Sequence, residues 1–162
     1  MPITLEGTAE VLDLLQTTVS QTKKICGRTV YVGAEIVADE CKKRLMALET
    51  DDSIHKGRTG KRRGPSKRQK AALIESMGIA SIRYNAGVYD VKLGFDGYND
   101  IVTERWPKGQ PNAMIARSVN KGTSFMEAQP FMDLSVESKK DVAEKAMTEE
   151  FSKQVEKLWE KI

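Results

Sequence analysis

The C-terminal end of this 162-residue sequence carries one long amphipathic pattern. Between Glu137 and Ile162 the apolar residues recur at helical spacing: Val142, Ala146, Met147, Phe151, Val155, Leu158, Trp159 and Ile162. Acidic and basic residues occupy most of the positions between them. This spacing predicts a helix with one apolar face. Because such a helix is stabilised mainly by tertiary packing, another part of the chain or a partner has to cover that face.

Further helices are predicted nearer the N-terminus. Over residues 29–48 the apolar positions again recur at steps of three and four: Ala34, Val37, Ala38, Cys41, Leu45 and Leu48. A shorter helix is predicted over residues 8–16. Another is predicted from Ser66, as its N-cap, to Met77, with Gly78 as its C-cap glycine.

The middle of the sequence has the signature of a β-hairpin. Residues 79–84 and 88–95 are rich in β-branched and aromatic side chains and are separated by Asn85-Ala86-Gly87. Residues 88–95 alternate in polarity, so one face of that strand is expected to be buried. Asn112 is expected to cap a short helix that runs to Val119. We therefore predict a single α+β domain over the whole chain, with the long N-terminal helix and the C-terminal helix packed on a small antiparallel hairpin.

Composition narrows the class of protein. A chain of 162 residues with 40% hydrophobic residues can bury a core without a disulfide or a metal. Its apolar stretches are much shorter than the roughly 20 residues of a membrane-spanning helix, and its first residues lack a signal pattern. We expect a protein made and used inside a cell. Cys26 and Cys41, with His55 as the one other soft ligand, do not form a zinc pattern and are expected to be reduced thiols.

The net charge of +3 conceals a basic segment. The stretch from Ser53 to Ile74 holds eight basic residues and no acidic one: Lys56, Arg58, Lys61, Arg62, Arg63, Lys67, Arg68 and Lys70. Because it also contains glycines and a proline but no aromatic residue, we predict a flexible basic arm over residues 53–70. The arm is either a solvated loop or the contact site for an anionic partner, such as nucleic acid or an acidic protein surface.

Catalytic patterns are absent from the sequence. His55 lies inside the basic segment, without neighbours that would orient it as a base. The adjacent carboxylates Asp51-Asp52 and Glu149-Glu150 are interpreted as solvated faces. Residues 57–62 contain two glycines and a lysine but lack the spacing of a phosphate-binding loop. We therefore expect no enzyme activity, no cofactor and no metal.

Two loops carry large side chains that favour protein contacts. Aromatic, arginine and methionine residues are typical of interfaces, and loops are where such contacts concentrate. For Trp106 and Phe125 the alternative is a loop aromatic folded over its own core. The predicted subunit-contact residues are Tyr98, Arg105, Trp106, Thr123, Ser124, Phe125 and Met126.

The segment 122–131, Gly-Thr-Ser-Phe-Met-Glu-Ala-Gln-Pro-Phe, reads as a structural corner. Gly122 is suited to a positive φ, and Thr123 and Ser124 to bonding loose backbone groups. Pro130 favours the first turn of a helix whose Phe131 points inward. A Gly-Thr-Ser segment followed by Ala-x-Pro-Phe, after a helix and a hairpin, resembles the tail-completion or head–tail joining proteins of long-tailed bacteriophages and prophages.

The resemblance spans the chain from Ala34 to its C-terminus, with two departures. Met132-Asp133-Leu134 stands where Arg-Pro-Ala is common, and the basic segment replaces a shorter one that usually contains Pro-Val-Asp-Thr-Gly. The resemblance implies a structural virion protein of the neck, assembled in the host cytoplasm, with no cofactor. It implies a ring of copies, six to match the tail tube, between the head connector or adaptor and the tail-tube or tail-terminator proteins.

Two roles remain open for the basic arm within this picture. It lines the channel and meets genomic DNA, or it grips an acidic neighbouring protein. A different function is also consistent with the charge pattern: a small accessory protein that binds nucleic acid without sequence preference through Lys61, Arg62, Arg63, Lys67 and Arg68. No membrane partner is expected.

Overall fold

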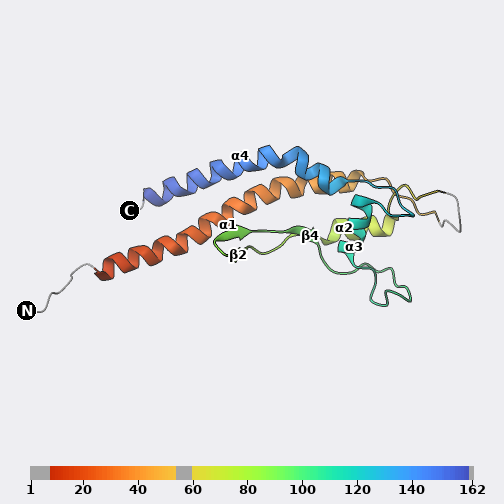
Figure 1. Ribbon diagram of the computed structural model, residues 1–162, viewed down its shortest axis with the longest axis horizontal. Helices are drawn as coiled ribbons and strands as arrows, with labels where there is room; N and C mark the ends of the chain where they lie inside the picture. Colours follow the sequence, from red (N-terminus) through yellow and green to blue (C-terminus); the bar gives the residue numbers. More distant parts are fainter. Residues whose placement is uncertain (1–7, 54–59, 161–162) are drawn as a thin grey trace, which may run out of the picture.

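The computed structural model describes the backbone of residues 8–53 and 60–160, and side chains from Val19 onward within those ranges. The chain is α+β, as predicted (Figure 1). The elements run in the order α1 (Thr8–Ala47), α2 (Lys67–Ser76), β1 (Met77–Ile79), β2 (Arg83–Asn85), β3 (Val88–Asp90), β4 (Leu93–Phe95), α3 (Asn112–Lys121) and α4 (Phe131–Trp159).

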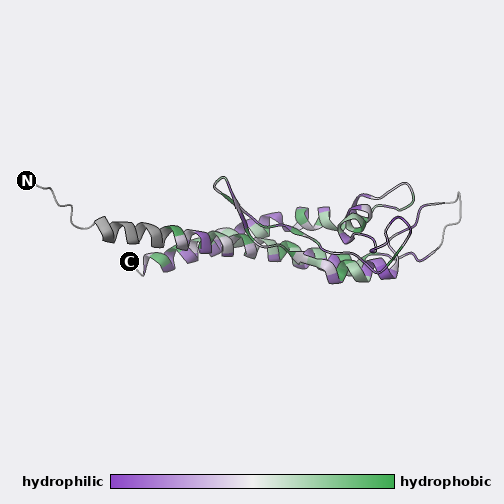
Figure 2. Ribbon diagram, turned by 90° about the horizontal axis from the view of Figure 1, so that it is seen from below, coloured by the Kyte–Doolittle hydropathy of each residue, from purple (hydrophilic) through white to green (hydrophobic). Residues whose placement is uncertain are grey.

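The two long helices lie side by side and run in opposite directions (Figures 1 and 2). The 40 residues of α1 give a rod about 60 Å long, and α4 packs along it. Gly33 permits the close approach, because a Cβ at this position would overlap the thioether of Met147. The buried Cys41 lies against Ser135 of α4, and its burial raises the pKa of the thiol. Neither Cys26 nor Cys41 is in a disulfide.

The prediction of two separate helices over 8–16 and 29–48 is wrong, because α1 is continuous from Thr8 to Ala47. Residues 17–28 contain no proline, and the cost of one helical glycine, Gly27, is only about 1 kcal/mol. Packing against α4 and the hairpin outweighs the weak helical preference of this stretch. The expected apolar face over 29–48 is confirmed: Cys41, Leu45 and Leu48 are buried, and Ala34, Val37 and Ala38 are half-buried.

The main core lies at one end of the helix pair, where the end of α1 meets α2, α3 and the start of α4. Its buried residues are Cys41, Leu45, Leu48, Leu73, Ile115, Ala116, Val119, Met126 and Phe131. Phe131 contacts the ring of Phe95 edge-on, with 6.0 Å between the ring centroids. Away from this end the helices cover each other only in part, so the molecule is a core with a helical rod attached (Figure 1).

The predicted hairpin is present but interrupted. β1 pairs with β4, with Gly78 opposite Gly94, and β2 pairs with β3, with Tyr84 opposite Tyr89. Ala86 and Gly87, with φ of 48° and 85°, make the tight turn between β2 and β3. The expected buried face is found in part. Tyr89, Val91, Leu93 and Phe95 are half-buried, and Leu93 and Phe95 pack against the main core, whereas Val88 and Lys92 are exposed. No residue of the four strands is fully buried.

The ends of the short helices differ in how well they were predicted. Ser66 caps α2 as expected, in a capping box with Gln69. Gly78 is not a C-cap, because the chain passes directly into β1 through Met77. Asn112 does not cap α3 either: Pro111 is the N-cap, and the buried Asn112 side chain donates instead to the carbonyl oxygen of Asp96 at 2.8 Å.

The C-terminal helix begins earlier than its apolar pattern predicts, at Phe131 rather than Glu137. Its predicted apolar face is only partly covered. Ala146, Met147, Val155 and Leu158 are half-buried, and Val142, Phe151 and Trp159 are exposed. Ile162 lies outside the described residues. Within the described ranges, none of the helices combines the length and the apolar character needed to cross a membrane.

Candidate interaction surfaces

Three distant chain segments meet in one place, which we call the joint: residues 49–52, 62–66 and 126–129. The backbone nitrogen of Arg62 donates to Phe125 at 2.9 Å, and the nitrogen of Glu127 donates back to the Arg62 carbonyl at 2.8 Å. On the other side, the nitrogen of Asp51 donates to the Pro65 carbonyl at 2.9 Å. Residues 62–66 are therefore held between the end of α1 and the corner that leads into α4.

The paired carboxylates Asp51 and Asp52 hold this segment in place. Asp51 accepts a hydrogen bond from the backbone nitrogen of Arg63 at 3.1 Å. Asp52 accepts one from the nitrogen of Lys67, the first residue of α2, at 2.9 Å. Asp52 is exposed and Asp51 half-buried, so the interpretation of a solvated helix end holds for Asp52. The structure adds a role that was not expected, because both carboxylates bind backbone N–H groups that helix and turn formation leaves unpaired.

Gln129 is the centre of the joint, and sequence reasoning did not select it. Its Oε1 accepts from the nitrogen of Glu49 at 2.9 Å. Its Nε2 donates to the Glu49 carbonyl at 3.1 Å and to the Arg63 carbonyl at 2.7 Å. The side-chain amide thus accepts and donates hydrogen bonds to the backbone in the same way as a peptide group in a β-ladder. A lone glutamine before a proline gives no sign of this role, because both partners are far away in the sequence.

Replacing Gln129 by glutamate is expected to lower the free energy of unfolding by about 1 to 2 kcal/mol. The carboxylate still accepts from Glu49 but has no N–H to donate to either carbonyl oxygen. Urea unfolding measures the change. The control is Glu127→Gln, a charge change at an exposed neighbour, for which we expect less than about 0.5 kcal/mol. Equal stability of Gln129→Glu and the native chain would contradict the role of the amide.

The corner at residues 122–131 has the predicted form. Gly122 has a φ of 73°, and a Cβ there would lie 3.0 Å from the nitrogen of Ala128. Thr123 bonds locally as expected: its backbone nitrogen donates to Met126 at 2.9 Å, and its Oγ1 accepts from the nitrogen of Phe125 at 3.3 Å. Pro130 is the N-cap residue, just before the first turn of α4, and Phe131 points inward and is buried.

The cap of α4 comes from the preceding helix. Pro130 offers no side-chain cap, and Asn120 of α3 takes over: its Oδ1 accepts from the nitrogen of Met132 at 2.9 Å. Its Nδ2 donates to Asp133 at 2.9 Å, and Lys121 forms an ion pair with the same carboxylate at 2.6 Å. The bond from Lys121 lowers the pKa of Asp133. A cap from another helix fixes the angle between α3 and α4.

The structure folds most of the predicted basic arm into the body of the protein. Of its described residues, 62–66 belong to the joint and 67–70 to α2, and Gly64 and Pro65 are buried, in contrast to the expected flexible arm. Lys70 donates to the Leu48 carbonyl at 2.8 Å, near the end of α1, and Arg68 pairs with Asp100 at 2.6 Å. The side chains of Lys61, Arg63, Lys67 and Arg68 are exposed and those of Arg62 and Lys70 half-buried, whereas Lys56 and Arg58 lie outside the described residues.

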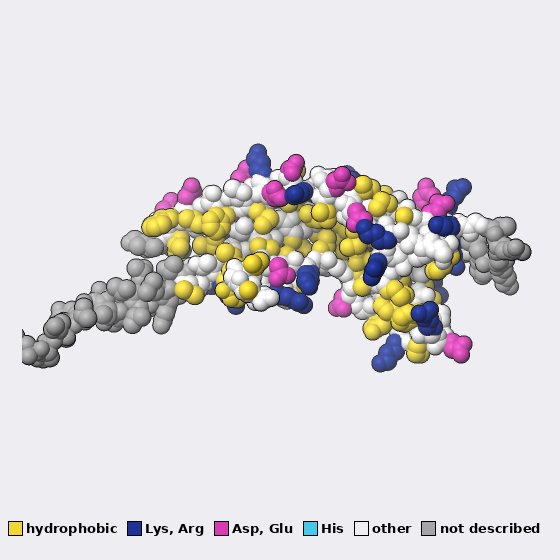
Figure 3. Space-filling view, viewed as in Figure 1, with side chains coloured by type: hydrophobic (Ala, Val, Ile, Leu, Met, Phe, Trp, Pro, Cys, Tyr) yellow, Lys and Arg dark blue, Asp and Glu magenta, His cyan; other side chains and the backbone are white. Residues whose placement is uncertain are grey.

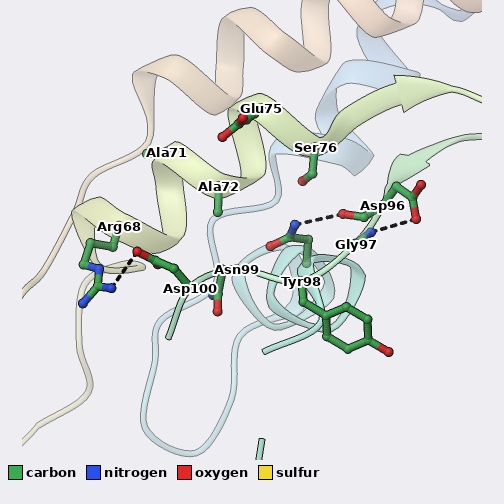
Figure 4. Close-up of a pocket in the computed structure, with 11 residues that line it drawn as sticks. Arg68, Ala71, Ala72, Glu75, Ser76, Asp96, Gly97, Tyr98, Asn99 and Asp100 are labelled. Carbon is green, nitrogen blue, oxygen red and sulfur yellow. Dashed lines mark hydrogen bonds and ion pairs between the residues drawn. The ribbon is translucent and has the colours of Figure 1, made fainter. Parts of the chain in front are cut away.

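A cavity of about 520 Å³ lies between α2 and the loop that follows β4 (Figure 4). The Arg68–Asp100 pair stands at one end and Asp96 and Gly97 at the other. The hydrogen bond from Arg68 lowers the pKa of Asp100. Asn112 lines the cavity, and its buried Oδ1 has no partner in the described part of the chain. This lining suits a polar group, but no cluster of three metal-binding side chains occurs among the described residues.

The predicted contact residues divide into three groups. Tyr98 and Phe125 are exposed by 60% and 64%, and Arg105 and Ser124 are also exposed. Trp106 is half-buried, with the guanidinium of Arg105 5.6 Å from its ring centroid, and Thr123 is half-buried too. Met126 is buried in the main core, so its assignment as a contact residue is wrong. The exposed side chains of this set, those of Tyr98, Arg105, Ser124 and Phe125, are available to a partner.

Comparison with known proteins found no relative of this chain. The chain matches no family model, no curated protein and no solved structure. The case for a function therefore rests on the chain's own surfaces, its shape and the corner motif.

Proposed function

We propose that this chain is a structural protein of a phage neck, which joins the head connector to the tail as an oligomeric ring. The observation that carries the proposal is the apolar surface that the described residues leave uncovered: thirteen of their large apolar side chains are exposed to solvent. Figure 3 shows hydrophobic side chains gathered along the helix pair. Exposed apolar surface of this kind marks contacts with other proteins.

The character of that surface also favours assembly. Large apolar side chains are exposed along the rod, on the hairpin and on the loops: Val19, Met46, Tyr84, Val88, Tyr98, Val102, Met114, Phe125, Leu134, Val136, Val142, Phe151 and Trp159. They belong to both long helices, to α3, to the hairpin and to the loops rather than to a single element. A subunit in a ring needs two different contact surfaces, one for each neighbour.

The corner motif is the feature that supports a phage neck in particular, because it resembles the motif of head–tail joining proteins. Residues 122–131 turn the chain from α3 into α4, and the joint fixes that turn against the end of α1. The proposed neighbours in the particle are the head connector or adaptor on one side and the tail-tube or tail-terminator protein on the other. The proposed ring has six copies and works by shape and adhesion, without a cofactor and without catalysis.

Mass measurement of the purified chain tests ring formation. We expect particles of about six times the subunit mass at high protein concentration, with a ring visible by negative-stain electron microscopy. A chain that stays monomeric up to hundreds of micromolar would count against the ring.

The second candidate function is non-specific nucleic-acid binding. The observation that favours it is the exposure of Lys61, Arg63 and Lys67 on one stretch of chain. Under this alternative, affinity for duplex DNA falls steeply with salt and is lost when Lys61, Arg62, Arg63, Lys67 and Arg68 are replaced by glutamine. Under the ring proposal, the same variant still folds and assembles.

A further inference from the structure

The corner and the basic segment enclose a hollow of about 300 Å³, which we call the corner hollow. Its lining includes Lys61 of the basic segment, Lys121 at the end of α3, and Thr123 and Ser124 of the corner. Among the described residues, no acidic one lines it. Two features that are far apart in the sequence, the basic segment and the Gly-Thr-Ser corner, therefore share one surface.

Backbone hydrogen bonds hold the two sides of the corner hollow against each other. The nitrogen of Arg62, the residue after Lys61, donates to the carbonyl oxygen of Phe125 at 2.9 Å. The nitrogen of Glu127 donates to the carbonyl oxygen of Arg62 at 2.8 Å. The backbone around the hollow is therefore already in place, and a ligand does not have to order it.

The polar side chains of the corner hollow have hydrogens left to donate. Ser124 is exposed, and its hydroxyl makes no hydrogen bond with another described residue. The hydroxyl oxygen of Thr123 accepts from the nitrogen of Phe125 at 3.3 Å, which leaves its hydrogen for another acceptor. The ammonium group of Lys121 bonds to Asp133 at 2.6 Å and has two further N–H groups. A ligand that accepts hydrogen bonds fits this lining.

The charge of the lining favours an anion with more than one negative group. Asp133 offsets the charge of Lys121 in part, whereas Lys61 has no ion pair with another described residue. Exposed cations continue along the chain from Lys61 at Arg63 and Lys67. A row of cations that leads away from the hollow matches the repeated charges of a phosphate backbone better than it matches a single carboxylate.

We propose that the corner hollow binds a phosphate group of a nucleic-acid backbone. Lys61 and Lys121 pair with its charge, and the hydroxyls of Thr123 and Ser124 donate to its oxygens. Contacts of this kind position a nucleic acid without reading its sequence. The site goes beyond the proposed ring and does not depend on it, and it adds Lys121 and two corner hydroxyls to the basic residues of the segment.

The salt dependence of binding to a short duplex DNA, measured by fluorescence anisotropy, tests the site. The site variant is Lys61→Gln with Lys121→Gln. The control is Lys42→Gln with Lys43→Gln, which removes the same charge from two exposed positions of α1. The slope of log affinity against log salt is expected to fall by about 2 in the site variant, because each lysine that contacts phosphate contributes about 1. The control is expected to keep the native slope and, like the site variant, the native melting curve.

The role of the corner hydroxyls is tested without a change of charge. Ser124→Ala removes a hydroxyl that bonds to no other described residue, so the variant is expected to fold normally. Inorganic phosphate is the probe, and NMR shifts of the backbone amides of residues 123–125 measure its binding. We expect saturable shifts in the native chain and affinity about 5-fold lower in the variant, as for the loss of one hydrogen bond. Equal affinity would contradict the role of the hydroxyl.

Three further outcomes would overturn the phosphate site. The first is a native chain that does not bind DNA at low salt, and the second is a site variant with the same salt slope as the control. The third is a native chain that binds a glutamate-rich peptide through Lys61 and Lys121 but does not bind DNA, which assigns the hollow to an acidic protein. In each case ring formation by the native chain is measured separately, so failure of the phosphate site leaves the ring proposal standing.

Discussion

Replacing Gly64 by alanine is expected to lower the melting temperature by roughly 10 °C, from a loss of about 3 kcal/mol. Gly64 is buried in the joint, and a Cβ there would overlap the carbonyl oxygen of Glu49 and lie 2.9 Å from its carbonyl carbon. Backbone atoms cannot move aside as a long side chain does. The segments at Glu49 and Gly64 have to separate, which also breaks the bonds made by Gln129.

The matched control is Gly78→Ala in β1. Nothing lies within 4 Å of a Cβ at Gly78, and its φ is not positive. Alanine in a strand loses less backbone entropy than glycine, so we expect unchanged or slightly higher stability. Thermal unfolding followed by circular dichroism measures both variants. Equal melting temperatures for Gly64→Ala and the native chain would show that the joint does not hold these segments together.

Replacing Leu45 by alanine is expected to cost about 3 kcal/mol, within the usual range for a fully buried leucine. Leu45 is completely buried where α1 meets the other helices. The truncation leaves a cavity between elements that are far apart in the sequence, and their backbones cannot collapse into it. The free energy of unfolding in urea measures the loss.

Met46→Ala is the control for this site, since Met46 follows Leu45 in the same helix and is 52% exposed. We expect a change within about 0.5 kcal/mol, as for most surface substitutions. Losses of similar size at both positions would mean that the core does not lie at this end of the rod.

Local signals were sufficient for the elements that depend on near neighbours. The Ser66 cap of α2, with its partner Gln69, spans four residues, and so does the turn at Ala86-Gly87, so both can be recognised in the sequence. Phe131 was predicted to point inward because a proline precedes it at a helix start. The continuity of α1 was missed, since residues 17–28 have weak helical preference and gain their stability from distant packing partners.

The candidate surfaces were harder to predict, because they depend on which distant segments meet. Gln129 bonds to Glu49 and Arg63, 80 and 66 residues away. Met126 was assigned to a contact surface from its place in a loop, but the bridge with Arg62 turns it into the core. The basic residues were expected on a flexible arm because their segment contains glycines and a proline but no aromatic residue. Asp51 and Asp52, just before that segment, supply the acceptors that hold it against the protein.

Electron microscopy of particles assembled without this chain tests the proposed role in the neck most directly. We predict full heads beside separate tails, and joined particles once the purified native chain is added back. Joined, complete particles formed in its absence would contradict a head–tail joining function.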